Sequence, residues 1–310
     1  MPYITGSAAD MDAVKTALVN ACTGDGWTEQ TDFEGKTVLS KSGIYVRVEA
    51  FADIGDGNPG FNLLGRTSLD GGDAPGVVSM RSIGDLPYPI IFPVTYHIFT
   101  FANNEVYLVI NYTEKYQWIA FGQSDQNGLP GTGNWVAATS GSGFSDRDDE
   151  GIWISESGGG GAFSWRKVTT GALFWATEYE ASSSRNGWVH NGLDSSYPWA
   201  LGEGGNTAGP VGIKYLTELV KTQPNAFNSE SVLMPVRAYK KRSENKISQV
   251  LEIENARHIR VDNYNNEQII TLGTDEWMIF PYYKKNINNR NGGEHVDHTG
   301  TFGWAIKKES

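Results

Sequence analysis

The chain has 310 residues, enough to bury a sizeable core, and carries 36 acidic and 25 basic residues for a formal net charge of −11. Hydrophobic residues make up 39 % and aromatic residues 12 % of it, which excludes an intrinsically disordered chain. The acidic balance argues against general binding to nucleic acids or to anionic membranes. The single cysteine excludes an intrachain disulfide, and the 37 glycines favour turns and strands over long helices.

The first residues combine neither a basic segment nor an apolar segment of the kind that signal peptides contain. No window approaches the roughly 18 consecutive apolar residues of a membrane span. We therefore expect no signal peptide and no membrane insertion, and we expect synthesis in a cytoplasm.

The first element that the pattern predicts is a helix over residues 8–22. Ser7 is the expected N-cap, and the apolar stripe of Met11, Val14, Leu18 and Cys22 follows the helical spacing of three and four. Cys22 is thus expected to be a small buried hydrophobic residue rather than a nucleophile.

After this helix the apolar period changes to two, which predicts strands over residues 38–40, 44–50 and 61–65. The Asp- and Gly-rich segments 53–60 and 69–76 are expected to be loops, and neither matches the calcium-loop pattern. The clearest hairpin has strands over residues 96–101 and 105–112 around an Asn turn, and a further strand is predicted over 116–122. Residues 1–125 are thus expected to form one domain, a helix packed on an antiparallel sheet.

Residues 126–228 are rich in Gly, Ser, Asn and Asp but also carry many tryptophans. A disordered linker would rarely contain so many large aromatic side chains, because ordering them requires burial of their surface. We predict a loop-rich elaboration anchored by these tryptophans, which are also our candidates for subunit interfaces, where aromatic residues are enriched. The candidate interface residues are Trp135, Trp153, Trp165, Trp175, Trp188 and Trp199.

Residues 229–310 are expected to be a C-terminal antiparallel β segment that can pack with the first domain. Closely spaced strands are predicted over residues 232–239, 250–253, 259–261, 268–272, 277–283 and 301–306. The whole chain is therefore expected to be mainly β with a short N-terminal α-helix, an α+β arrangement. Its antiparallel sheets should form a sandwich or small barrel with long Gly- and Trp-rich loops.

The sequence nominates no catalytic residue, no cofactor-binding residue and no metal ligand set. It lacks a nucleophile elbow and a phosphate loop. The segment Glu294–His298 concentrates possible metal ligands, but its Gly-rich flanks indicate a polar loop. Asp146–Glu150 and the basic run Lys240–Arg242 are both interpreted as solvated segments.

Two stretches of the sequence resemble a known class of proteins. They are PYPIIFPVTYHIFTFANNEVYLVINYTEKYQWIAFGQS at residues 87–124, and, within residues 232–308, VLMPVRAYKK, HIRVDN, LGTDEWMIFPYYKKN and TGTFGWAIKK. Together they resemble structural proteins of tailed-bacteriophage virions, of the kind found in the neck or collar, the tail or the baseplate. The resemblance implies a symmetric homo-oligomer, a ring or collar, that binds other phage tail or neck proteins in the virion and has no catalytic activity.

Two other functions stay open at this point. One is a carbohydrate-binding receptor-recognition or decoration module, for which Trp188, Tyr197 and Trp199 are the first candidates, with His190 beside them. The other is a polysaccharide-degrading hydrolase, because any two of the acidic residues can converge in space.

Overall fold

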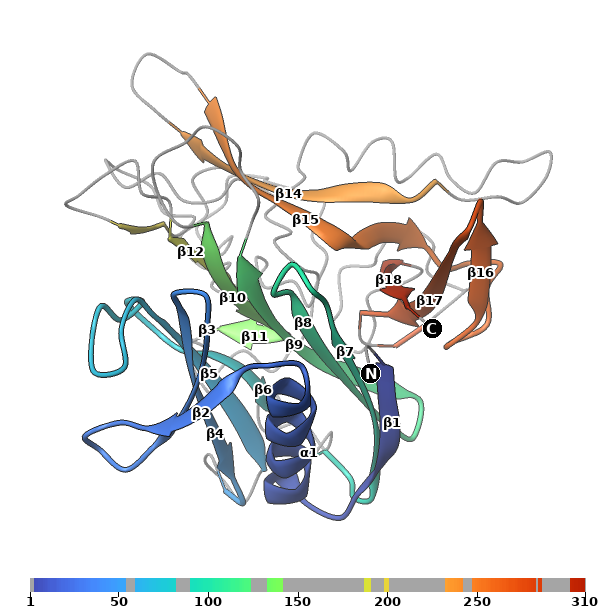
Figure 1. Ribbon diagram of the computed structural model, residues 1–310. Helices are drawn as coiled ribbons and strands as arrows, with labels where there is room; N and C mark the ends of the chain where they lie inside the picture. The colour runs from blue at the N-terminus through green and yellow to red at the C-terminus, as the bar shows by residue number, and fades with distance from the viewer. Residues whose placement is uncertain are drawn as a thin grey trace, which may run out of the picture.

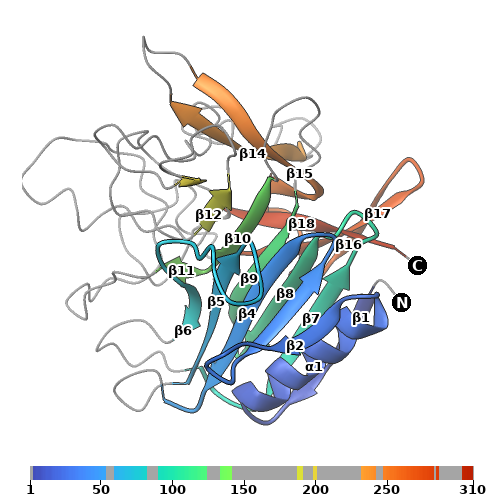
Figure 2. The same ribbon diagram turned by 60° about the vertical axis from the view of Figure 1, so that its left-hand side comes forward.

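The computed structural model describes residues 3–53, 59–81, 90–123, 133–141, 187–190, 198–200, 232–241, 247–282, 284–285 and 302–309. Within these residues the chain forms one α-helix and three antiparallel sheets, which are stacked in layers (Figures 1 and 2). The prediction of a mainly β chain with an N-terminal helix and a sandwich-like arrangement of antiparallel sheets is confirmed. The predicted Gly- and Trp-rich loops fall largely outside the described residues.

The central sheet has seven strands and lies between the other two. Its order is β1 (Tyr3–Ala8), β7 (Val94–Thr100), β8 (Val106–Tyr112), β9 (Lys115–Gln123), β10 (Asn134–Ala138), β12 (Gly187–His190) and β13 (Trp199–Ala200).

The N-terminal sheet has six strands, in the order β11 (Ser140–Gly141), β6 (Val78–Arg81), β5 (Gly60–Arg66), β4 (Ile44–Phe51), β3 (Thr37–Lys41) and β2 (Thr28–Thr31). The C-terminal sheet has five, in the order β14 (Met234–Lys241), β15 (Ile247–Arg260), β18 (Phe302–Lys308), β17 (Asp275–Pro281) and β16 (Ile269–Leu272). In Figure 2 the blue strands of the N-terminal sheet lie over the green strands of the central sheet.

Both faces of the central sheet are buried, so its strands are apolar on both sides instead of alternating with polar residues. On β8, Leu108 faces the N-terminal sheet and the helix, whereas Tyr107 and Val109 face the C-terminal sheet. All three side chains have no exposed surface. Because successive side chains of a strand point to opposite faces of the sheet, one apolar run contributes to two separate cores.

Helix α1 spans Met11–Gly24 and contributes the predicted apolar stripe to the core between the central and N-terminal sheets. Cys22 is fully buried on this stripe, as predicted, and burial raises the pKa of its thiol. The predicted start of the helix and its cap were wrong, because Ser7 and Ala8 belong to β1 and pair with β7. Asp10 caps the helix instead, and its Oδ1 accepts a hydrogen bond from the Ala13 amide at 2.7 Å.

The predicted hairpin is confirmed as β7 and β8. Thr100 pairs with Val106, and the turn is closed by a hydrogen bond from the Phe101 amide to the Glu105 carbonyl oxygen at 3.0 Å. Asn104 adopts a positive φ of 67° there, a conformation that asparagine tolerates better than most residues.

Segments from all three predicted parts of the chain meet in these layers. Strands β10 and β12, from the segment predicted to be loop-rich, extend the central sheet beyond β9. The C-terminal sheet packs on the face of the central sheet opposite the N-terminal sheet. The division at residues 125 and 228 stays a prediction.

Candidate interaction surfaces

Three of the six candidate interface tryptophans lie among the described residues, and all three are buried within this chain. Trp135 has no exposed surface and packs in the core beneath the C-terminal sheet. Trp188 and Trp199 are 4 % and 5 % exposed and belong to the core beneath the N-terminal sheet. Their burial leaves little surface for a partner or for stacking on a sugar. Trp153, Trp165 and Trp175 lie outside the described residues.

Trp199 has a specific role in this core. Its Nε1 donates to the Gly72 carbonyl oxygen at 2.9 Å, which holds the loop after β5. A Cβ at Gly65 would lie 2.8 Å from Trp199 Cη2, so glycine permits this approach. The neighbouring His190 is half-buried, its ring lies edge-on to that of Trp199, and burial lowers its pKa.

The other polar candidates of the sequence fall largely outside the described residues: Asp146–Glu150, Tyr197, Arg242 and Glu294–His298. Within the described ranges, no group of three or more His, Cys, Asp or Glu side chains is placed to hold a metal ion. In the same part of the chain, no helix has the length and apolar character needed to cross a membrane.

The edge strands of the three sheets differ in how they are protected against pairing with another chain. Strands β11 and β13 have two residues each, and short edges pair poorly. Strand β14 carries Pro235 and Arg237 and has two register shifts, all of which discourage pairing. Strand β2, with the sequence TEQT, exposes mostly polar side chains.

Strand β16 has none of these protections. Its sequence, IITL, contains no charge, proline or glycine, and Ile269 and Leu272 are 41 % and 51 % exposed. It pairs on one side with β17. Ile279 donates to the Gln268 carbonyl oxygen, so by ladder alternation Ile269 and Thr271 direct their backbone groups away from β17. Strand β16 is therefore a better template for another strand than β2, β11, β13 or β14.

The start of β16 is fixed to the central sheet by Glu267, a residue with a positive φ of 62°. Glu267 Oε1 accepts from the Tyr116 hydroxyl at 2.9 Å and lies 3.6 Å from His97 Nε2. His97 and Tyr116 together hold the pKa of Glu267 below its ordinary value. The second nitrogen of His97, Nδ1, lies 2.9 Å from the Tyr3 hydroxyl. The edge is thus presented in a defined position.

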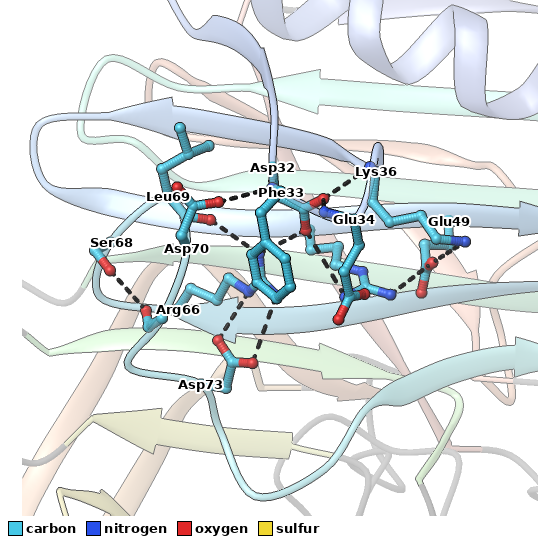
Figure 3. A network of polar contacts seen from close by, with 12 residues as sticks. Asp32, Phe33, Glu34, Lys36, Glu49, Arg66, Ser68, Leu69, Asp70 and Asp73 are labelled. Atoms are coloured by element: carbon cyan, nitrogen blue, oxygen red, sulfur yellow. Dashed lines mark hydrogen bonds and ion pairs between the residues drawn. The ribbon is translucent and has the colours of Figure 1, made fainter.

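A second feature is a polar network at the rim of the N-terminal sheet (Figure 3). Its centre is the pair of Arg66 and Asp32, whose side chains are 2 % and 0 % exposed and 2.8 Å apart. Arg66 also donates to the Leu69 carbonyl oxygen at 2.9 Å and pairs with Asp73 Oδ1 at 2.8 Å. Burial alone would raise the pKa of Asp32, but the amides of the β2–β3 turn and Arg66 lower it.

Asp32 also holds the β2–β3 turn, because its Oδ1 accepts from the Glu34 amide at 3.0 Å and the Lys36 amide at 2.8 Å. From the loop after β5, Asp70 Oδ1 accepts from the Phe33 amide at 2.9 Å. Sequence reasoning identified this loop but missed the network, because Asp32 and Arg66 are separated by 34 positions. The only local signal was the turn sequence Asp32–Gly35, with Gly35 at a φ of 77°.

The chain matches no protein-family model, and no curated protein sequence is significantly similar to it.

Proposed function

We propose that this chain is a non-catalytic structural subunit of a tailed-phage virion, one that assembles with copies of itself into a ring or collar. The observation that carries the self-assembly is strand β16, an apolar and unprotected edge held in place by Glu267. Natural sheets usually block such edges, since an open edge invites association through backbone hydrogen bonds. The virion context is supported by the resemblance of residues 87–124 and 232–308 to phage structural proteins.

The geometry of pairing decides the type of assembly. A β16 edge that binds a different surface of the next copy makes a head-to-tail contact. Repetition of such a contact closes a ring if the rotation between copies closes, and extends into an open filament if it does not. A β16 edge that pairs with itself makes only a two-fold dimer. The proposal requires the head-to-tail arrangement.

The test removes one outward backbone donor of β16 without touching its hydrogen bonds to β17. Thr271→Pro does this, because proline is tolerated in an edge strand where its nitrogen faces solvent. The matched control is Glu29→Pro in β2, the polar edge, where the same alternation directs the Glu29 amide outward. Sedimentation velocity and negative-stain images of the concentrated proteins provide the readout.

Wild-type protein and Glu29→Pro should form closed rings, and Thr271→Pro should stay monomeric. Phage carrying Thr271→Pro should yield no intact virions. A wild-type protein that is monomeric at high concentration, that stops at a dimer, or that forms open filaments would contradict the ring. Rings formed by Thr271→Pro would show that β16 is not the assembling edge.

A further inference from the structure

Phe33 is the most exposed large hydrophobic side chain of the described residues, at 74 %. It lies in the turn between β2 and β3, next to Asp32 (Figure 3). Isolated apolar residues are common on protein surfaces, so exposure alone does not indicate that such a residue has a function. The setting of Phe33 differs, because its exposed ring is attached to a backbone that is held both by hydrogen bonds within its own turn and by a hydrogen bond to the loop after β5.

The first set of hydrogen bonds lies within the turn itself. The buried Asp32 carboxylate accepts from two turn amides, and the Asp32 amide donates to the Lys36 carbonyl oxygen at 3.0 Å. The second contact comes from the loop after β5, where Asp70 Oδ1 accepts a hydrogen bond from the Phe33 amide at 2.9 Å. That loop is in turn held by Arg66 and, through Gly72, by Trp199. The Phe33 backbone is thereby connected to the core.

Burying the Asp32–Arg66 pair has a desolvation cost, so the pair is weak evidence for stability. What it does achieve is one defined geometry for the turn and the adjoining loop. A backbone held in place before binding loses less conformational entropy when a partner arrives. Large aromatic side chains in such positions are frequent centres of binding energy.

The charges around Phe33 indicate the chemistry of the partner. Glu34, Asp70 and Asp73 are exposed acidic residues of the two segments that flank the ring. Two cations of this region lie beneath them, since the side chains of Arg47 and Arg66 are only 14 % and 2 % exposed. The third, Lys36, is 42 % exposed but pairs with Glu49 at 3.0 Å. A partner therefore meets an aromatic ring bordered by carboxylates. Nucleic acids and anionic membranes are repelled by such a surface.

We propose that Phe33, with Glu34, Asp70 and Asp73, is a docking surface for a segment of a second protein that combines large apolar residues with Lys and Arg. We call these four residues the Phe33 surface. The ring packs against the apolar side chains of that segment, and the carboxylates pair with its basic residues and orient the partner. This surface lies on the N-terminal sheet, whereas β16 lies on the C-terminal sheet, so the proposal stands whether or not copies of the chain pair through β16.

The probe is a random dodecapeptide display library, with the full-length chain as bait. Wild-type bait should enrich peptides that combine a large apolar residue with Lys or Arg, and raised salt should weaken their binding. Phe33→Ala should reduce the affinity of these peptides at least about tenfold. Asp70→Asn, which keeps an oxygen acceptor for the Phe33 amide but removes the charge, should weaken basic peptides selectively. Ile91→Ala, at another exposed apolar position, should leave binding unchanged.

Phe33→Ala should melt at the wild-type temperature, which separates loss of binding from loss of folding. The Thr271→Pro bait should select the same peptides as the wild type, which separates this surface from the β16 edge. The proposal is overturned if no peptide is enriched, if the enriched peptides lack basic residues, or if they bind Phe33→Ala equally well. It is also overturned if Phe33→Ala abolishes ring formation, because a second copy would then be the occupant.

Discussion

The two faces of the central sheet bury different kinds of side chain. Towards α1 and the N-terminal sheet the core is dominated by aliphatic residues, such as Val14, Leu18, Val46 and Leu108. Towards the C-terminal sheet it is rich in aromatic residues: Phe99, Phe101, Tyr107, Tyr116, Trp118, Trp135, Phe280, Tyr282 and Trp304. The titratable groups also differ, because the ion pair of Asp32 and Arg66 lies at the rim of the first core while His258 and Glu105 lie inside the second interface.

Glu105 makes specific hydrogen bonds across the interface between the central and C-terminal sheets. Strand β15 shifts its register against β14 between Pro235 and Val236, which leaves backbone amides without ladder partners. The Glu105 carboxylate accepts from the amides of Glu254 and Asn255 at 2.8 and 2.9 Å and from the Tyr107 hydroxyl at 2.7 Å. Burial raises the pKa of Glu105 despite these bonds. The aromatic interface is thus joined by specific polar contacts, whereas the aliphatic one relies on apolar packing and its rim.

The largest expected effect comes from Trp118→Ala, which removes a fully buried ring from the aromatic core. It should lower the free energy of unfolding by about 3–5 kcal/mol in urea titrations followed by circular dichroism. Leu108→Ala is the matched change on the other face, expected at about 2–5 kcal/mol. A single transition in both variants would show that the layers unfold together. A separate early transition in Trp118→Ala alone would show that the C-terminal sheet is an independent unit.

The next effect tests the rim of the N-terminal sheet. Asp32→Asn removes the buried carboxylate that pairs with Arg66 and leaves the exposed Asp73 as the described counter-charge of Arg66, so it should lower the free energy of unfolding by about 3 kcal/mol at pH 7. Because the folded-state pKa of Asp32 is lowered, its contribution is present above the unfolded value and is lost as pH falls through the folded one. An unchanged stability in Asp32→Asn would show that the pair is not needed to hold the turn.

A smaller effect should appear in mildly acidic solution and come from the aromatic side. Burial lowers the pKa of His258 to about 3, while the unfolded chain binds this proton below pH about 6.5. Protons therefore favour the unfolded chain between these values, and stability should fall by about 2 kcal/mol from pH 6.5 to pH 5.

His258→Asn removes this titration and keeps an acceptor for the Tyr282 hydroxyl, so it should flatten the pH dependence of unfolding. Asp32→Asn should leave the slope in this range unchanged. A full slope in His258→Asn would assign it to another group, and the half-buried His190 would be the first to test.

The sequence permitted good predictions where the signal is local. The apolar stripe from Met11 to Cys22 and the β7–β8 hairpin both depend on residues close in the chain, and both are confirmed. The helix cap was misplaced because β1 pairs with β7, about 90 residues away. The division into three sheets could not be predicted either, because it also depends on pairing between strands that are not consecutive in the chain. One example is β18, which lies between β15 and β17.

The candidate surfaces illustrate the same limit. Residues 268–272 were predicted as a strand, but neither their place at a sheet edge nor their exposure follows from a run of apolar residues. Phe33 was not singled out from the sequence, because its fixation depends on Asp70 and Arg66 from another hairpin. Trp135 was read as an interface residue because aromatic residues suit both interfaces and cores. The structure places it in a core.

Hydrogen exchange at residues 269–272 tests the central claim, assembly through β16, most directly. The amides of Ile269 and Thr271, which point away from β17, should exchange quickly in dilute protein. They should become protected in concentrated protein, while the amides of Glu29 and Thr31 in the polar β2 edge stay unprotected. Equal exchange of Ile269 and Thr271 at both concentrations, in a sample that sediments as a ring, would contradict the account.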